Sequence, residues 1–288
     1  MLYLLVVSLM WAFSFGLIGN ALAEVDTYFV ASFRLLCALL LLLPCLRIQE
    51  IPKSDWLMLL GRGAIQFGLM YVCYIKAFQY LPSHLVALFT ILTPLYVVLI
   101  HNFRTKQLSI AALAAAALSV LGAAILKAHS DAFESWWIGF ALLQVSGVAF
   151  AYGQVTYREW KMRYRYVSDL QVFALLYAGG FVFAAIVSFA LTDWAQLPQT
   201  SDQWQALIYL GFVASGLGFF LWNMGAARSQ PAVLAACNNA VVPLAMLCSL
   251  FIFGEATAQA AGDWLRLLIG TACIAAAVLL AQRQVLAR

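Results

Sequence analysis

Aromatic and uncharged polar side chains lie inside several long apolar stretches of the sequence, and these are the residues that could do chemistry. A polar group among apolar residues is costly, so it usually has a partner or a function. Amides, hydroxyls and indole rings can together bind a small neutral or zwitterionic molecule. The predicted substrate-binding residues are Trp11, Phe15, Tyr74, Thr90, Tyr152, Trp222, Asn223, Asn238 and Asn239.

Each of these residues also has a structural alternative. Asn238 and Asn239 could instead form interhelical hydrogen bonds, as Asn commonly does in membranes. Trp11 and Phe15 lie one helical turn apart, so their rings could equally pack against other helices or face lipid. The same holds for Trp222.

Three cations also fall within apolar stretches. Arg62 and Lys76 lie near the ends of theirs, so we expect both side chains to extend to water. Arg34 is deeper, and a structural pairing role is favoured over substrate contact. If Arg34 does face a cavity, it could bind a substrate carboxylate.

The sequence contains no pattern typical of catalysis or metal binding. It lacks a glycine-rich nucleotide loop, a Ser/His/Asp set and an HExxH motif. The cysteines show neither CxxC nor Cys/His spacing, so we interpret them as packing residues. We therefore predict no catalytic residue, no metal and no cofactor.

The composition excludes a soluble globular domain, because 65% of the residues are hydrophobic and only 10% are charged. A run of about 20 apolar residues crosses a bilayer as one helix. The sequence predicts ten such runs: Leu2 to Leu22, Tyr28 to Leu46, Trp56 to Gln79, Pro82 to Phe103, Leu108 to Lys127, Trp136 to Tyr157, Leu170 to Leu191, Gln203 to Ala226, Pro231 to Phe253 and Asp263 to Gln282.

The positions of Lys and Arg predict the orientation of these helices. With a cytoplasmic N-terminus, the outside connections carry only Lys76, Lys127 and Arg266, while the remaining connecting cations lie inside. This bias places both termini in the cytoplasm of a multi-pass protein of the bacterial inner membrane, surrounded by lipid. The basic residues thus report orientation, and we predict no nucleic-acid partner.

The sequence repeats itself, with a first unit at 1–130 and a second at 131–288. The first and sixth runs both contain Ala-Phe, a small residue, an aromatic and Gly. Pro82 and Pro94 in the fourth run have the same spacing as Pro231 and Pro243 in the ninth. Ala77 matches Ala226, which pairs Tyr74 with Asn223 and Thr90 with Asn239, and Gly122 matches Gly270. Because each unit has five helices, the second must enter the membrane from the opposite side.

These motifs, and Phe253-Gly254-Glu255 after the ninth run, resemble the EamA-type family of the drug/metabolite transporter superfamily over essentially the whole chain. The resemblance implies an all-α integral membrane protein with ten helices in two inverted five-helix repeats and both termini cytoplasmic. One departure is visible, because Arg104-Thr105-Lys106 replaces the glutamate often found after the fourth helix.

Pro94 and Pro243 each fall about half way along a predicted helix, where proline bends the helix. We predict that they are hinges of an alternating-access cycle in which one repeat rocks against the other. Static kinks that only shape packing are the alternative.

The pattern as a whole favours a secondary transporter of a small neutral or zwitterionic metabolite, such as an amino acid, that acts as a monomer and without ATP. The resemblance implies that the direction is export. No Asp or Glu lies in the middle third of a run, which argues against proton coupling. A multidrug exporter of lipophilic compounds is disfavoured because no central carboxylate could pair with a cation. A membrane-embedded enzyme or scaffold is disfavoured because no catalytic cluster is visible.

Overall fold

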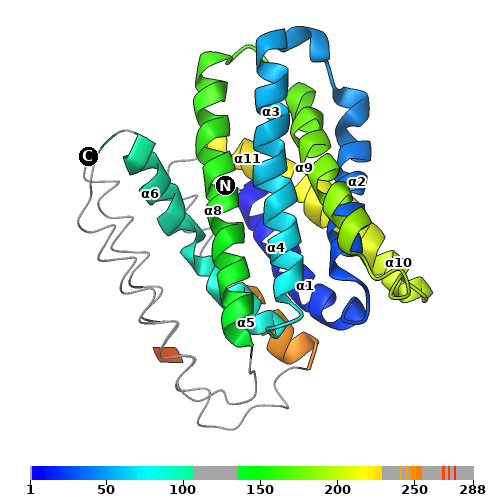
Figure 1. Cartoon of the computed structure of the whole chain (residues 1–288). Helices are drawn as coiled ribbons and strands as arrows, with labels where there is room; N and C mark the ends of the chain where they lie inside the picture. Colours follow the sequence, from blue (N-terminus) through cyan, green and yellow to red (C-terminus); the bar gives the residue numbers. More distant parts are fainter. Residues whose placement is uncertain are drawn as a thin grey trace.

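The computed structural model describes residues 2–104, 106, 135–228 and 247–254, together with 241, 244, 245, 268, 269, 272 and 276. Every regular element among these residues is a helix (Figure 1). Six described helical segments are long and apolar enough to cross a membrane. They match the first, second, third, sixth, seventh and eighth predicted runs and comprise Tyr3–Ala21, Thr27–Cys45, Lys53–Ala77, Trp136–Arg163, Asp169–Leu191 and Ser201–Gly225.

The first part of the chain forms two α-helices and then a third helix that is α-helical at both ends and π-helical in the middle. Asp26 caps the second helix, because its carboxylate accepts hydrogen bonds of 2.9 Å from the backbone N–H groups of Tyr28 and Phe29. The elements are α1 (Leu2–Ala21), α2 (Thr27–Leu42), the 3₁₀ turns η1 (Leu43–Cys45), η2 (Ile48–Glu50) and η3 (Lys53–Asp55), α3 (Trp56–Gly63), the π-helical segment η4 (Ala64–Leu69) and α4 (Met70–Ala77).

The predicted fourth run is a broken helix. It consists of α5 (Ser83–Phe89), a 3₁₀ turn η5 (Thr90–Leu92) and α6 (Thr93–Arg104). Pro94 has no backbone N–H to donate to the carbonyl of Thr90, four residues earlier, so the regular helical ladder is interrupted here. A 3₁₀ turn thus interrupts the helix next to Pro94, whereas the hinge role of Pro94 stays a prediction.

The second part of the chain also contains a helix with a π-helical middle. Thr200 and Gln203 start that helix with reciprocal side-chain to backbone hydrogen bonds of 3.3 and 3.1 Å. The elements are α8 (Trp136–Arg163), α9 (Asp169–Leu191), α10 (Ser201–Ile208), the π-helical segment η6 (Tyr209–Leu217), α11 (Gly218–Arg228) and a further π-helical segment η7 (Cys248–Ile252).

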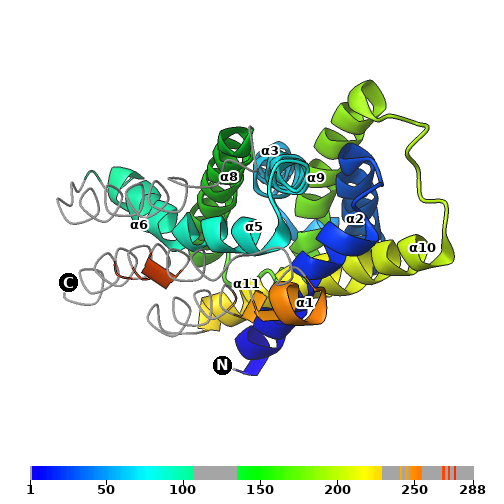
Figure 2. The ribbon, with the colours of Figure 1, turned by 90° about the horizontal axis from the view of Figure 1, so that it is seen from below.

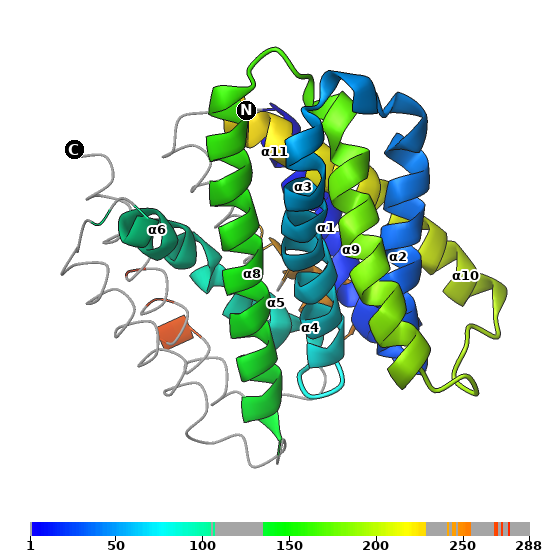
Figure 3. The ribbon, with the colours of Figure 1, turned by 45° about the horizontal axis from the view of Figure 1, so that its top comes forward.

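Four rods stand side by side in the order α8, α3–η4–α4, α9 and α2 (Figures 1 and 3). Seen from below, α1, α11 and the short α5 lie along one face of this row (Figure 2). α8 also contacts α6, and α1 packs on α11. Helices from the two halves of the chain therefore pack directly against one another.

The contact between α3 and α9 depends on glycine. A Cβ atom added to Gly63 would lie 1.9 Å from the carbonyl oxygen of Leu176, and one added to Gly179 would lie 1.9 Å from that of Leu60. The two backbones therefore touch, which is the close packing that small residues permit between membrane helices.

The fifth predicted run and most of the ninth and tenth lie outside the described residues. So do Asn238, Asn239 and Pro243.

Candidate functional site

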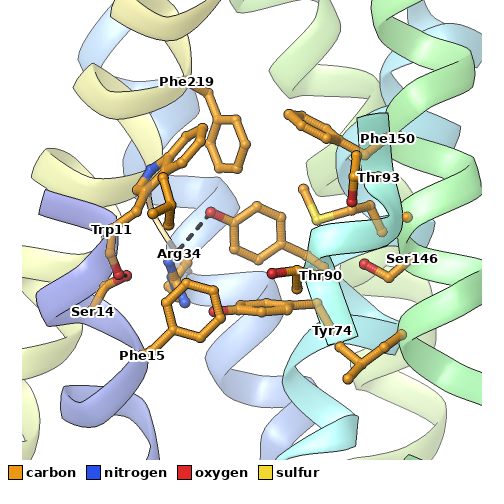
Figure 4. Close-up of a pocket in the computed structure, with 15 residues that line it drawn as sticks. Trp11, Ser14, Phe15, Arg34, Tyr74, Thr90, Thr93, Ser146, Phe150 and Phe219 are labelled. Atoms are coloured by element: carbon orange, nitrogen blue, oxygen red, sulfur yellow. Dashed lines mark hydrogen bonds between the residues drawn. The ribbon is translucent and has the colours of Figure 1, made fainter. Parts of the chain in front are cut away.

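A cavity lies between the row of four rods and the helices α1 and α11 on one face of that row (Figure 4). Its volume is about 100 Å³. Its described walls come from α1, α2, α4, the turn η5, α6, α8 and α11, together with Val241. The lining residues are Trp11, Ser14, Phe15, Arg34, Met70, Tyr71, Tyr74, Thr90, Thr93, Leu143, Ser146, Gly147, Phe150, Phe219 and Val241.

Arg34 is the charged group among the described lining residues, and it is only 3% exposed. Its Nε donates a 3.1 Å hydrogen bond to Oγ of Ser215, and its Nη2 donates a 3.3 Å bond to the hydroxyl of Tyr71. The guanidinium carbon also lies 4.8 Å from the centre of the Tyr71 ring, a cation–π distance. The guanidinium is thus held in one place by neutral groups.

Ser215 organises this arrangement from the π-helical segment η6. Its Oγ accepts hydrogen bonds from Arg34 and, at 2.7 Å, from the hydroxyl of Tyr71. It donates its own proton to the carbonyl of Leu210, five residues earlier, at 2.7 Å. The π-helical turn supplies this acceptor and leaves both lone pairs of Ser215 for the two side chains.

The remaining nitrogen of Arg34 suggests what the cavity can bind. Nη1 is buried and has no hydrogen-bond partner among the described residues. The lining residues that the structure describes include no Asp or Glu to neutralise the guanidinium. A buried and unpaired charge costs several kcal/mol, so an entering carboxylate would supply the missing counterion and accept the missing hydrogen bond.

Aromatic rings cover the cavity on two sides of Arg34 (Figure 4). Trp11 packs against Phe219 at a centroid distance of 4.7 Å, and its Nε1 donates a 3.0 Å bond to the carbonyl of Ala214. Phe15 and Tyr74 meet edge to face at 5.7 Å on the other side. The body of a ligand would therefore lie against apolar ring faces while its charged end reached Arg34.

Trp11, Phe15, Tyr74 and Thr90, four of the predicted binding residues, line this cavity. Whether they bind substrate stays a prediction.

Three other predicted residues do not line the cavity. Trp222 is buried behind Trp11, with ring centroids 4.9 Å apart. Asn223 donates its amide to the carbonyl of Phe219 in its own helix at 2.8 Å. The carbonyl of Tyr152, farther along α8, accepts a 2.8 Å bond from Thr156.

Sequence reasoning did not select several residues that the fold brings to the cavity. Ser14 and Tyr71 were visible as polar residues in apolar runs, and Arg34 as a deep cation. Nothing in the sequence distinguishes the other lining residues from core positions, and these are Met70, Thr93, Leu143, Ser146, Gly147, Phe150, Phe219 and Val241.

A second, more polar cavity of about 140 Å³ lies near the start of α3 and the end of α8. Arg104 donates to both carboxylate oxygens of Glu159 at 2.8 and 2.6 Å, which joins α6 to α8 and raises the pKa of Arg104. Trp160 Nε1 donates to Asp55 at 2.7 Å. Arg62, expected to reach water, lines this cavity but has a buried Nη1 without a partner in the described residues.

Known proteins resemble the chain in sequence and in fold. The model of the EamA-like transporter family matches residues 1–128. The biotin transporter of Escherichia coli K12 is 37% identical over 257 residues, which cover 88% of this chain and 85% of that protein. A probable biotin transporter of Pseudomonas aeruginosa is 37% identical over 282 residues, covering 96% of each chain.

A crystal structure with 19% sequence identity superimposes with a TM-score of 0.66 over 97% of this chain and 96% of the other, which shows the fold. The long apolar helices and the relatives named as transporters both indicate a membrane transporter. The chain therefore belongs to the EamA-like transporter family, and it is a multi-pass transporter of the bacterial inner membrane rather than an enzyme.

Proposed function

We propose that the chain carries biotin, or a carboxylate closely similar to it, across the inner membrane and binds the carboxylate at Arg34. The observation that carries this proposal is the buried guanidinium with one free nitrogen, in a cavity whose described lining has no acidic residue. Relatives named as biotin transporters align with most of the chain.

The chemical groups of biotin match those of the cavity lining. Its carboxylate ends a short aliphatic chain, which leads to a fused ring system with a thioether and a cyclic urea. The rings of Trp11, Phe15 and Tyr74 offer apolar faces to the chain and the thioether. Hydroxyls of Ser14, Thr90 and Ser146 add polar points around them.

The cavity chemistry favours such a ligand over the amino acids expected from the sequence. An amino acid also carries an ammonium group, which would need an acidic or carbonyl-rich partner. The described lining offers Arg34 and no carboxylate, so the ammonium would meet a like charge. Lipophilic cations are disfavoured for the same reason.

We also propose the wider architecture expected from the sequence. In it, ten helices form two inverted repeats, 1–130 and 131–288, with both termini cytoplasmic, in a monomer that needs no cofactor and binds no nucleic acid. The positive-inside bias and the repeated motifs support it. So does the presence of a π-helical segment, η4 or η6, in the third helix of each predicted repeat.

The proposed cycle is alternating access around the cavity, with Pro94 and Pro243 as hinges and the substrate's own gradient as the driving force. The break at Thr90–Leu92, beside the cavity, supports a bend in this helix. Export, expected from the resemblance, and uptake are the same cycle run in opposite directions.

Transport by the purified full-length protein in liposomes tests this function. Radiolabelled biotin should enter in a saturable manner, with or without a pH gradient, and unlabelled biotin should compete. Leucine, phenylalanine and tetraphenylphosphonium should compete weakly. Saturable leucine flux without biotin flux would reject the proposal and restore the amino-acid prediction, and biotin flux that requires a pH gradient would reject the gradient-driven mechanism.

A further inference from the structure

Gln66 is fully buried, and neither atom of its side-chain amide has a hydrogen-bond partner among the described residues. Each buried polar group left in this state costs about 1 to 3 kcal/mol. Gln66 also lies in the π-helical segment η4, and such segments are frequent at functional sites. Both observations point to a ligand that completes the amide's hydrogen bonds.

Gln66 lies next to the cavity. Its own rod, α3–η4–α4, and the helix that it packs against, α8, both contribute residues to the cavity lining. Gln66 lies one turn before Met70 in the α3–η4–α4 rod, and Met70 lines the cavity. Its side chain packs against Gly153 of α8, where an added Cβ would lie 2.2 Å from Gln66 Cβ. Gly153 comes one turn after Phe150, which also lines the cavity. Gln66 therefore lies just beyond the cavity, toward the start of α3.

The sequence repeat gives Gln66 a counterpart whose role is visible. Gln66 precedes Ala77 by the same number of residues as Ser215 precedes Ala226, the alanine with which Ala77 is aligned. Both residues lie in π-helical segments. Ser215 donates to the backbone and holds Arg34 by accepting its hydrogen bond. At the equivalent position in the first half, Gln66 has a polar side chain with no partner in the described structure.

We propose that Gln66 recognises the second polar end of the substrate, a cyclic urea or amide, and so determines specificity among carboxylates. A carboxamide can donate an N–H to the urea carbonyl and accept an N–H from the same ring through its own oxygen. Tyr71, which holds Arg34, follows Gln66 by five residues, about 7 Å along a helix. This spacing suits a ligand whose carboxylate and urea are separated by a short aliphatic chain. The inference rests on the proposed function.

Ligands that differ only in the urea end provide the test. We would measure binding of biotin and of heptanoate, a carboxylate with no urea, to the purified full-length protein and to Gln66→Met, which has a similar volume. Biotin affinity should fall about tenfold or more, equivalent to one strong hydrogen-bonded contact, while heptanoate affinity should change less than about twofold. The thermal stability of the empty protein should not fall, because the amide makes no described hydrogen bond.

Two further variants control the interpretation. Gly153→Ala would place a Cβ 2.2 Å from Gln66 Cβ, which is fixed to its backbone, so α8 and η4 must move apart and the thermal stability of the empty protein should fall, unlike in Gln66→Met. Gln144→Met removes a half-buried amide that is bonded to Tyr96 and Phe140 and lies outside the cavity lining, so it should leave the preference for biotin over heptanoate unchanged. Equal loss of both ligands in Gln66→Met, or no loss of biotin affinity, would overturn the inference. Wild-type protein that binds heptanoate and biotin equally would overturn it too, whereas wild-type protein that binds neither would reject the proposed function itself.

Discussion

Arg34 and Ser215 are 181 residues apart in the sequence, yet the guanidinium Nε lies 3.1 Å from the serine hydroxyl and donates a hydrogen bond to it. This contact joins α2 to the π-helical segment η6 and fixes the charged group of the cavity. The hydroxyl is neutral, so it orients the guanidinium without neutralising it.

Replacing Arg34 with Gln should weaken biotin binding by about 30-fold or more, because one partner of a desolvated charge pair typically contributes at least 2 kcal/mol. The methyl ester of biotin has no charge, so its affinity should be almost the same in the wild type and in Arg34→Gln. Equilibrium binding of both ligands to purified protein measures the difference. Arg34→Lys should be intermediate, since it keeps the charge and loses the planar fork. A loss of ester binding as large as the loss of biotin binding would instead indicate a damaged fold.

Tyr71→Phe should weaken biotin binding about three- to tenfold, the effect of removing one net hydrogen bond of about 1 kcal/mol. The phenyl ring still lies against Arg34, so the cation–π contact remains. Ser215→Ala should have the larger effect, because the bond from Arg34 to Ser215 is the shorter one, at 3.1 Å against 3.3 Å to Tyr71, and no ring contact replaces it. Dissociation constants for the two variants test this order, and the reverse order would show that the Tyr71 hydroxyl, rather than Ser215, is the main group that orients Arg34.

The sequence was sufficient to predict the membrane class and the six described spans, because apolar length and the cost of an unsatisfied backbone in lipid act locally. It also indicated four lining residues of the cavity. It did not predict that Arg34 would face the cavity while bonded to Ser215, because that outcome depends on how α2 is rotated against η6. The π-helical winding that brings Ser215 to Arg34 likewise depends on packing between helices rather than on local propensity.

Asn223 shows the limit of reasoning from residue type. An amide in an apolar run predicts a partner, but the chain itself supplies one in the carbonyl of Phe219 four residues earlier. Gln66 has the same chemistry, and no such bond is formed within the described residues. Only the structure separates the two cases.

Gly63→Ala should destabilise the protein strongly, whereas Gly61→Ala on the same helix should be neutral or stabilising. The Cβ at position 63 would overlap the carbonyl of Leu176, while nothing lies within 4 Å of a Cβ at position 61. Overpacking costs about 1 to 3 kcal/mol, and Ala in an exposed helical position gains up to about 1 kcal/mol over Gly. Thermal unfolding of the two variants in the same detergent is the measurement, and equal melting temperatures would show that α3 and α9 separate easily.

Pro94→Ala should leave biotin affinity within about twofold of the wild type and slow the transport rate severalfold. Alanine restores the N–H that can bond to the Thr90 carbonyl, so the break at Thr90–Leu92 should become more helical and less able to bend. Binding and initial rates of liposome uptake, measured on the same preparation, separate the two effects. An unchanged rate would mean that the bend is a static kink.

The neutral surroundings of Arg34 have an electrical consequence. On the proposed cycle the empty carrier presents one uncompensated positive charge in its cavity, and the bound carboxylate cancels it. One elementary charge crossing the membrane potential corresponds to about 2.3 kcal/mol per 100 mV. The loaded carrier should therefore reorient without sensing the voltage, whereas an inside-negative potential should hold the empty carrier open to the cytoplasm. Exchange of one substrate molecule for another would then be voltage-independent, and the rate of net flux would be set by the return of the empty carrier.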